Sequence, residues 1–306
     1  MKGQYPGVRR FRKSWQLQAI FLLPLIYLLV FKYVPMYGAQ IAFRNFNAVD
    51  GIWGSPWIGM HYFSRFFHSY EFYRVLRNTV SLALYHLVAT FPFPILLALS
   101  LNYLRAGRFQ KTMQMVTYAP HFISVVVMVG IILEMLDPRT GLFNQMLQLF
   151  GLQAVHFMAH PGWFQSIYVW SDVWQHVGWN SIIFLATLAG IDPTLHEAAI
   201  MDGATKWRRV WHIDLPGILP VAVILLILNA GHLMDLGFEK VLLLQNPLNQ
   251  QASEVIDTYV YRVGLASSLV NFSYATAIGL FKSVVNLLLL LVLNTAARKA
   301  GQESLW

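Results

Sequence analysis

EAAIMDGATKWRRVWHIDLP, residues 197–216, is a charged stretch between two strongly apolar segments. Its charged residues are Glu197, Asp202, Lys206, Arg208, Arg209 and Asp214. A bilayer core penalises each Arg, Lys or Asp at mid-depth by roughly 2.5–3.5 kcal/mol, so this stretch is expected to lie outside the lipid. Pro193 and Gly203 predict a short helix over residues 193–204, followed by a turn and by a new membrane helix whose first turn contains Pro216.

The composition of the whole chain is that of a membrane protein. Of its 306 residues 57% are hydrophobic and only 12% are charged, and the mean hydropathy is +0.50. The absence of cysteine excludes disulfides, thiol catalysis and cysteine-bound metals. The net charge of +8 does not predict a nucleic-acid partner, because the basic residues lie mainly in the segments between the predicted membrane helices and follow their arrangement.

Six apolar segments are long enough to cross a hydrocarbon core, which needs about 20 helical residues. They are residues 17–34, 78–104, 112–133, 167–191, 215–236 and 273–297. The sequence therefore predicts an all-α, polytopic membrane protein with six transmembrane helices and a single domain over residues 1–306. The basic start, residues 1–13, precedes an apolar run longer than the core of a signal peptide, so the first helix is expected to be retained.

The distribution of Lys and Arg predicts the orientation of these helices. Thirteen of them lie in the 63 residues of segments 1–16, 102–114, 192–215 and 297–306. Six lie in the 106 residues of the opposite segments, 35–76, 137–164 and 237–272. By the positive-inside rule the first set is cytoplasmic, together with both termini and the loop 192–215 between the fourth and fifth helices.

The charged loop also carries a motif at fixed spacing. Glu-Ala-Ala, three residues, Gly, nine residues, Ile, one residue and Leu-Pro are filled by Glu197, Ala198, Ala199, Gly203, Ile213, Leu215 and Pro216, and Asp202 before the glycine also fits. This stretch resembles the cytoplasmic coupling loop of the membrane subunits of ABC importers. The resemblance implies that Glu197 pairs with a basic residue in a cleft of an ATPase subunit, and that Ala198 and Ala199 permit close packing. The alternative is an ordinary amphipathic loop helix.

Five further phrases are similar to the carbohydrate branch of these importers, which handles oligosaccharides and polysaccharide fragments and includes alginate importers. They are FKYVPMYGAQIAF (31–43), GIWGSPWIGMHYF (51–63), RVLRNT (74–79), DLGFEKVLLLQNP (235–247) and GLFKSVVNLLLL (279–290). With them the resemblance covers nearly the whole chain. The outside loops carry both signs of charge, so the sequence leaves open whether the sugar is acidic or neutral.

The resemblance implies a multi-pass permease subunit of the bacterial cytoplasmic (inner) membrane that forms half of a translocation pathway. Its expected partners are a second permease subunit of a different sequence, two ATP-binding subunits, an extracytoplasmic solute-binding protein, a saccharide and membrane lipid. The dipeptide Gly-Lys does not occur in the chain, so no phosphate-binding loop of the Walker A type is present. ATP hydrolysis is therefore expected on the partner subunits.

Polar residues within the predicted helices indicate the sugar path, because polar groups in lipid need partners or water. On the fourth helix the candidates are Trp170, Asp172, Trp174, Gln175, His176 and Asn180. Asp172, Gln175, His176 and Asn180 are spaced to share one face. The alternative is an interfacial tryptophan belt.

The fifth and sixth helices add Asn229, His232, Lys282 and Asn286 as path candidates. For Asn229 and His232 the alternative is structural pairing between helices. For Lys282 it is a side chain that extends to the membrane surface.

Two other classes of function, an embedded enzyme and a transporter without ATPases, explain the sequence less well than the importer. An embedded enzyme has little support: His196 and Glu197 begin an H-E-x-x-H motif whose last position is Ile200, and no G-x-S-x-G motif occurs. We expect no catalytic residue, cofactor or metal. A secondary sugar transporter or channel without ATPases is the remaining alternative, but it leaves residues 197–216 unexplained and the break at Pro92 and Pro94 without a counterpart.

Overall fold

The computed structural model describes residues 15–104 and 107–299, and these residues are predominantly helical. The predicted basic start, residues 1–13, lies outside this range. The chain divides into two compact units. The first comprises the residues up to Phe67 together with Val263–Leu280, and the second comprises His68–Arg262 together with the residues from Phe281 onward. The long helix α18 (Phe272–Lys299) begins in the first unit and continues into the second.

The first unit contains an uninterrupted apolar span over residues 16–43. Its elements are α2 (Trp15–Leu28), the π-helical η1 (Leu29–Tyr33), α3 (Val34–Met36) and the 3₁₀-helical η2 (Tyr37–Phe43). The span extends nine residues beyond the predicted end at residue 34, because Pro35 lies in the first turn of α3, where a proline costs no hydrogen bond. None of its most apolar window is buried, as expected for a helix that contacts lipid or another chain.

The loop after this span folds on itself around Arg44. Its guanidinium donates to the carbonyl of Ser55 at 2.8 Å and lies 5.5 Å from the centre of the Trp57 ring. The same unit contains two short helices, α4 (Gly51–Gly54) and α5 (His61–Phe67), and all but the first residue of the π-helical η6 (Arg262–Ala266). This part of segment 35–76 is thus an ordered loop.

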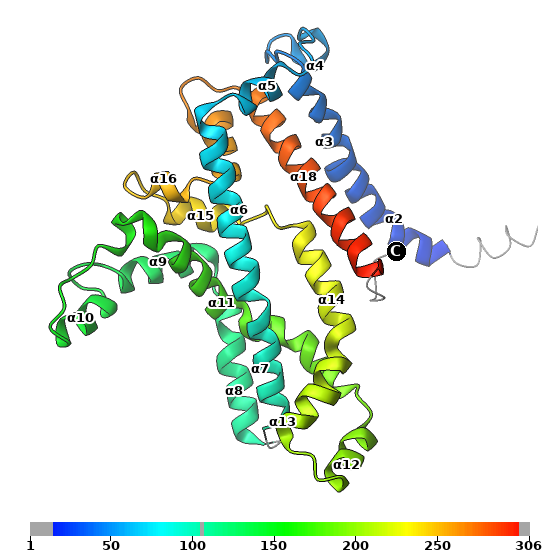
Figure 1. Ribbon diagram of the computed structural model, residues 1–306. Helices are drawn as coiled ribbons and strands as arrows, with labels where there is room; N and C mark the ends of the chain where they lie inside the picture. Colours follow the sequence, from blue (N-terminus) through cyan, green and yellow to red (C-terminus); the bar gives the residue numbers. More distant parts are fainter. Residues whose placement is uncertain (1–14, 105–106, 300–306) are drawn as a thin grey trace, which may run out of the picture. The chain divides into compact units, whose positions relative to one another are not determined.

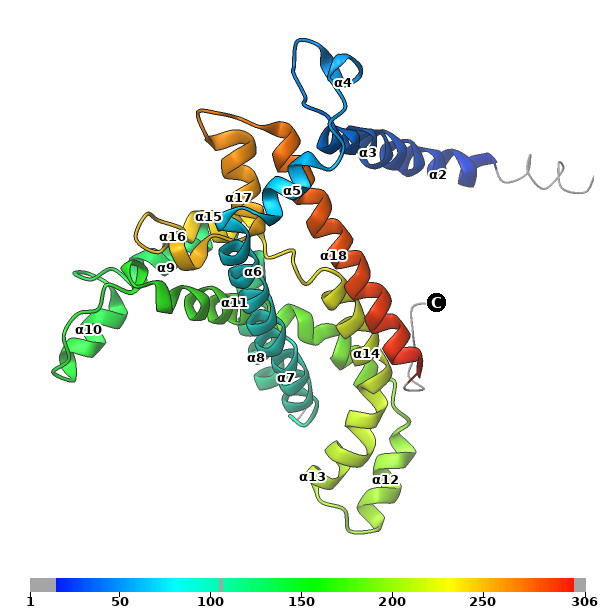
Figure 2. The same ribbon diagram turned by 45° about the horizontal axis from the view of Figure 1, so that its top comes forward.

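The second unit is a bundle of helices that Figure 1 and Figure 2 show from two directions. Its first half consists of α6 (Tyr70–Thr90), α7 (Pro92–Asn102), α8 (Arg108–Tyr118), η3 (Ala119–Phe122), α9 (Val125–Met135), α10 (Leu142–Leu149) and η4 (Phe157–Ala159). Its second half consists of α11 (Pro161–Ala189), α12 (Pro193–Met201), α13 (Lys206–Arg209), η5 (Val210–Asp214), α14 (Leu215–Gly231), α15 (Phe238–Leu244), α16 (Gln250–Ser253) and α17 (Ile256–Tyr261).

Helix α11 forms the centre of this bundle and packs mainly on α6 and α7. One buried cluster around Phe164, Tyr168 and Val169 joins α11 to α6 and α15. A second cluster around Phe184 and Leu188 joins α11 to α7 and α14. Helices α12 and α13 lie together at the end where α14 begins (Figure 1), so the charged loop forms one end of the bundle.

Further predicted helices differ from the structure. The predicted helix 112–133 is instead two helices, α8 with η3 and then α9, bent by 102°. The reason is local: Pro120 tightens the chain into a 3₁₀ turn, and Ser124 caps the N-terminus of α9 through Val127 N. Helix α6 begins eight residues before the predicted position 78, because Ser69 caps it at Phe72 N.

The end of the fifth helix also differs from the prediction. It was predicted at residue 236, but α14 ends at Gly231, where a Cβ atom would meet Leu290 of α18. Beyond it, the backbone N–H of Met234 donates to Asn286 Oδ1 at 3.2 Å instead of to a helical carbonyl. A long-range side-chain contact therefore satisfies the backbone where the helix stops.

Within the described residues, four helical spans have the length and apolarity to cross a membrane, or five if the bent pair α8–α9 counts as one. Helix α11 has 29 residues but is not among them, because polar residues interrupt its apolar sequence. The multi-pass character is therefore clear, whereas the count of six crossings stays a prediction.

Candidate coupling loop and translocation cavity

Helix α12 is fixed at both ends by local hydrogen bonds. Asp192 accepts from Thr194 N at 2.9 Å and caps its start, and that backbone N–H lowers the pKa of the Asp192 carboxyl. At the other end Gly203 has φ of +77°, and Ala204 N donates to Ala199 O at 2.8 Å across the turn. This is a left-handed C-terminal cap, which explains physically why the motif has Gly at this position.

The chain then re-enters the bundle through two short helical turns. Thr205 caps α13, and the π-helical η5 leads directly into α14 at Leu215, with Pro216 in its first turn. The predicted order of helix, turn and new helix is thus present. Ile213 and Leu215 are half-buried, and Leu215 packs against the cluster around Phe184, whereas Asp202 and Pro216 are exposed.

Asp214 joins the loop to the rest of the bundle. Its side chain is fully buried, and its Oδ2 accepts from the Tyr103 hydroxyl at 2.6 Å, just past the end of α7. His196 Nε2 of α12 lies 3.3 Å from its Oδ1. Burial, with the hydrogen bond to Asp214 as the second cause, raises the pKa of Tyr103 to about 12. The sequence pattern missed Asp214 as a structural residue, because its partners lie outside the motif.

The outer surface of the loop is available to a partner. Glu197 and Ala198 are exposed and Ala199 is half-buried, and no hydrogen bond or ion pair to Glu197 occurs within the described residues. Large apolar side chains around them are also exposed. They are Leu195, Ile200, Met201, Trp207 and Trp211. A carboxylate among exposed apolar groups suits a partner surface that offers a cation within an apolar cleft.

A cavity of about 570 Å³ lies among α6, α7, α11, α14 and the segment after α14. Five of the predicted path residues line it: Asp172, His176, Asn180, Asn229 and His232. Trp179 lines it too and stacks on His121 at 4.4 Å between ring centres. The cavity thus combines aromatic planes, amides and imidazoles, the groups that fit the C–H faces and hydroxyl edges of sugars.

Asp172 is the most connected polar residue of the cavity wall. His86 Nε2 lies 2.9 Å from its Oδ2, and Lys240 Nζ donates to its Oδ1 at 3.0 Å. The Lys240 side chain is buried and lies 4.9 Å from the centre of the Tyr168 ring. We did not predict Lys240 or His86 as site residues. The one hint in the sequence is that Lys240, next to Glu239, is the only basic residue in the largely apolar run from Leu236 to Leu244.

The other predicted path residues do not line this cavity. Gln175 is buried and donates to Ile123 O at 2.9 Å, on a different side of α11. Trp170 Nε1 donates to Tyr85, and Trp174 is 53% exposed.

Two path candidates on α18 form structural contacts within the second unit. Asn286 accepts from the Met234 backbone, as described above. Lys282 bridges two carboxylates, Asp235 at 2.5 Å and Asp257 at 2.6 Å. These contacts were not predicted, and they give both residues a structural role within the second unit.

Among the described residues, no group of three or more His, Asp or Glu side chains is placed to hold a metal ion.

Comparison with known proteins identifies the family. Residues 90–301 match the model of the binding-protein-dependent transport system inner membrane component. The chain belongs to this family. It is 44% identical to the polygalacturonan/rhamnogalacturonan transport system permease protein YteP of Bacillus subtilis (strain 168), over 92% of this chain and 87% of YteP. It is 41% identical to Protein LplB of the same organism, over 96% of this chain and 92% of LplB.

Two solved structures have the same fold. One is a bacterial ABC transporter involved in the import of the acidic polysaccharide alginate, with a TM-score of 0.88 and 38% identity over 96% of this chain and 99% of that chain. The other is a bacterial alginate ABC transporter in complex with an alginate pentasaccharide-bound periplasmic protein, with a TM-score of 0.89 and 37% identity over 97% and 99%.

These matches confirm the predicted all-α fold and the resemblance to sugar permeases of ABC importers. The chain is a multi-pass permease subunit of the inner membrane and belongs to a family of transport components.

Proposed function

We propose that this permease forms half of the translocation pathway of an ATP-driven importer for an oligosaccharide or polysaccharide fragment. The observation that carries the proposal is the exposed, capped helix α12, which presents Glu197 on a chain of the permease family. A helix capped at both ends keeps its shape when it is pushed, which is what a mechanical contact with a motor subunit requires.

In this proposal six helices cross the membrane, with both termini and α12 in the cytoplasm. The density of Lys and Arg in the segments on that side supports this orientation. Helix α11 is the crossing that lacks sufficient apolarity by itself. It is accommodated because it lies at the centre of the bundle, with α6, α7 and α14 packed around it.

The proposed assembly contains a second permease subunit of a different sequence, two ATP-binding subunits and an extracytoplasmic binding protein. The similar alginate transporter was solved with its periplasmic protein, which supports the last partner. The exposed Glu197 and the exposed apolar residues around it are the evidence for a contact with the ATP-binding subunits. These subunits would hydrolyse ATP, and this chain would transmit their movement.

We further propose that the substrate is an acidic saccharide. The named substrates of similar transporters, polygalacturonan with rhamnogalacturonan in one case and alginate in the other, are acidic polysaccharides. In this chain Asn180, Asn229 and Trp179 would contact the sugar in the cavity. The carboxylate of Asp172 would not repel it strongly, because Lys240 and His86 contact both of its oxygens.

Reconstitution of the complex in proteoliposomes tests the coupling role. Glu197→Lys places a cation where the proposal requires an anion, so we expect the ATP-binding subunits to dissociate and ATP-dependent uptake to fall at least tenfold. Glu239→Lys is the matched control, because Glu239 is an exposed carboxylate on α15, on the opposite side in the proposed orientation. Full uptake by Glu197→Lys, or wild-type uptake without ATP, would contradict the proposal and favour a secondary transporter.

A further inference from the structure

A second hollow of the permease has the composition of a saccharide site. It has a volume of about 770 Å³ and lies among the first turns of α6, the start of α11, and α16. Its wall contains Tyr70, Tyr73, Arg77, Asn78 and Gln165, and it includes no Asp or Glu. The wall also lacks aliphatic side chains larger than alanine or proline. We call this hollow the tyrosine–arginine groove.

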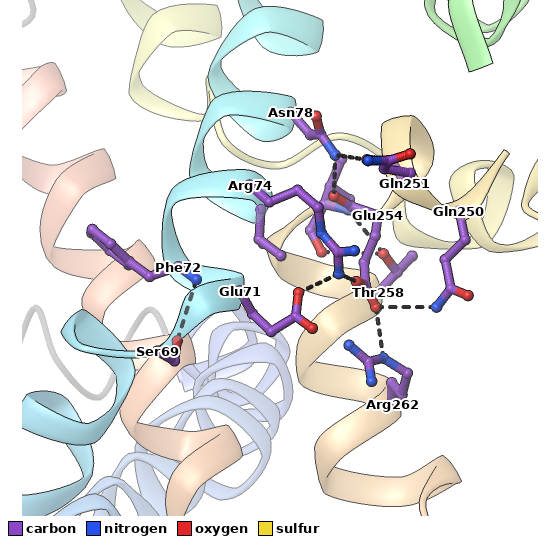
Figure 3. Close-up of polar contacts among 12 residues, drawn as sticks. Ser69, Glu71, Phe72, Arg74, Asn78, Gln250, Gln251, Glu254, Thr258 and Arg262 are labelled. Carbon is purple, nitrogen blue, oxygen red and sulfur yellow. Dashed lines mark hydrogen bonds and ion pairs between the residues drawn. The ribbon is translucent and has the colours of Figure 1, made fainter.

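The two arginines of the groove differ in charge balance. Arg74 is neutralised, since its guanidinium pairs with Glu71 and with Glu254, the latter at 2.5 Å. Figure 3 shows the Arg74 guanidinium between these two carboxylates, with Arg262 on the other side of Glu254. Arg77 is exposed, and within the described residues no acceptor pairs with its guanidinium. The groove therefore carries one uncompensated positive charge.

The walls of the groove are held in place by hydrogen bonds between helices. Asn78 Nδ2 donates to the carbonyls of Gln251 at 2.9 Å and Glu254 at 3.1 Å, and so ties α6 to α16. Gln165 Nε2 donates to Ser81 Oγ at 3.1 Å, and so ties α6 to α11. The groove is thus formed before any ligand enters, which lowers the entropic cost of binding.

Two tyrosine rings of the groove are largely exposed. Tyr70 is 86% exposed and Tyr73 is 72% exposed. Exposed aromatic rings beside amides and hydroxyls match the apolar faces and hydroxyl edges of sugar rings, and a guanidinium matches a carboxylate with two parallel hydrogen bonds. A lipid would need aliphatic surface for its acyl chains, which this wall does not provide.

We propose that the tyrosine–arginine groove binds a uronate-containing segment of the saccharide, with a sugar carboxylate on Arg77 and ring faces on Tyr70 and Tyr73. The inference rests on the proposed import function. It adds a binding site outside the translocation cavity, at the end of α6 that the charge distribution predicts to face outward. At this end the groove would bind the saccharide before the saccharide enters the translocation cavity.

Binding of a short oligogalacturonate to the intact complex in nanodiscs tests the site. Arg77→Gln should raise the Kd about tenfold, the loss expected for one hydrogen-bonded charge pair at a partly exposed position. Arg139→Gln is the matched control, because Arg139 is exposed on another loop of the same predicted side. The same oligosaccharide with its carboxyl groups reduced should bind equally to wild type and Arg77→Gln. Tyr73→Ala should weaken both oligosaccharides.

Several outcomes would overturn the inference. Equal effects of Arg77→Gln and Arg139→Gln would mean that only the surface charge matters. An effect confined to nanodiscs with anionic lipid would assign Arg77 to lipid headgroups, and a changed affinity for the binding protein would assign it to docking. A complex that imports a saccharide with ATP but does not bind the acidic probe would refute the groove alone. Lack of any ATP-dependent uptake would refute the proposed function instead.

Discussion

The coupling loop and the translocation cavity are stabilised in opposite ways. In the loop the caps of α12 and α13 are bonds between residues two or three positions apart, such as Asp192 with Thr194. In the cavity Asp172 contacts His86 and Lys240, which are 86 and 68 residues away. A local cap requires particular residues at a fixed spacing, so it can be recognised in a short stretch of sequence. A contact between distant helices produces no such pattern. The two regions should therefore respond differently to mutation.

The largest effect is expected from removing the buried cation of the cavity wall. Lys240→Met would leave the Asp172 carboxylate without its buried partner, and breaking such a pair costs about 3–5 kcal/mol. We expect thermal unfolding of the purified permease in detergent to shift strongly downward. The double variant with Asp172→Asn should recover much of the loss, because no uncompensated charge remains.

Lys111→Met is the control for this prediction. Lys111 is exposed on α8, and its replacement should change the stability by no more than about 0.5 kcal/mol. If Lys240→Met were as mild as this control, long-range pairing would not hold the cavity together, and the comparison with the loop would fail.

The next effect concerns Tyr103, which links the two regions. Tyr103→Phe removes the hydroxyl that donates to the fully buried Asp214, and an acceptor left in this state costs about 1–3 kcal/mol. We expect lower stability together with more ATP hydrolysed per saccharide imported. The reason is that movement of the coupling loop would be transmitted less completely to α7. Tyr85→Phe is the control, since the Tyr85 hydroxyl bonds to the exposed Trp170.

A loss of stability with an unchanged ratio of ATP to saccharide would give Tyr103 a purely structural role. The motif itself did not reveal this contact. It contains the position of Asp214 but no information on Tyr103, which is 111 residues away.

The sequence was most informative where structure depends on near neighbours. The order of α12, turn and α14 was predicted because Gly203 and Pro216 restrict the backbone locally. On α11 the helical period correctly placed Asp172, His176 and Asn180 together, but it also placed Gln175 with them. Gln175 instead bonds to Ile123 in the bend between η3 and α9, and that bend was not predicted.

Gly203→Ala should have a moderate and local effect. An alanine at φ of +77° costs about 1–2 kcal/mol relative to glycine, although there is open space for its Cβ. We expect weaker binding of the ATP-binding subunits and little change in the unfolding of the whole permease. Gly130→Ala is the control, because Gly130 has open space as well but no positive φ. Equal behaviour of the two variants would show that the cap of α12 does not set the affinity.

The smallest effect is expected at the start of α12. There a substitution can remove the charge of the capping side chain and keep its shape. The pKa of Asp192 is lowered in the folded protein, so its ionised form stabilises the helix above the unfolded pKa of about 4. That contribution is lost as the pH falls through the lower, folded value. Asn at this position caps equally well but does not titrate. Between pH 5 and pH 3, hydrogen exchange of the α12 amides should therefore accelerate more in wild type than in Asp192→Asn.

The amides of α7 provide the internal reference for this measurement, since both proteins share the same acid titration elsewhere. Asp192→Ala, which has no cap, should exchange faster than both at neutral pH. Parallel pH profiles for wild type and Asp192→Asn would mean that the carboxylate contributes only its shape. In that case the cap of α12 would not respond to pH. The stability of the coupling loop would then depend on the long-range contact of Asp214 instead.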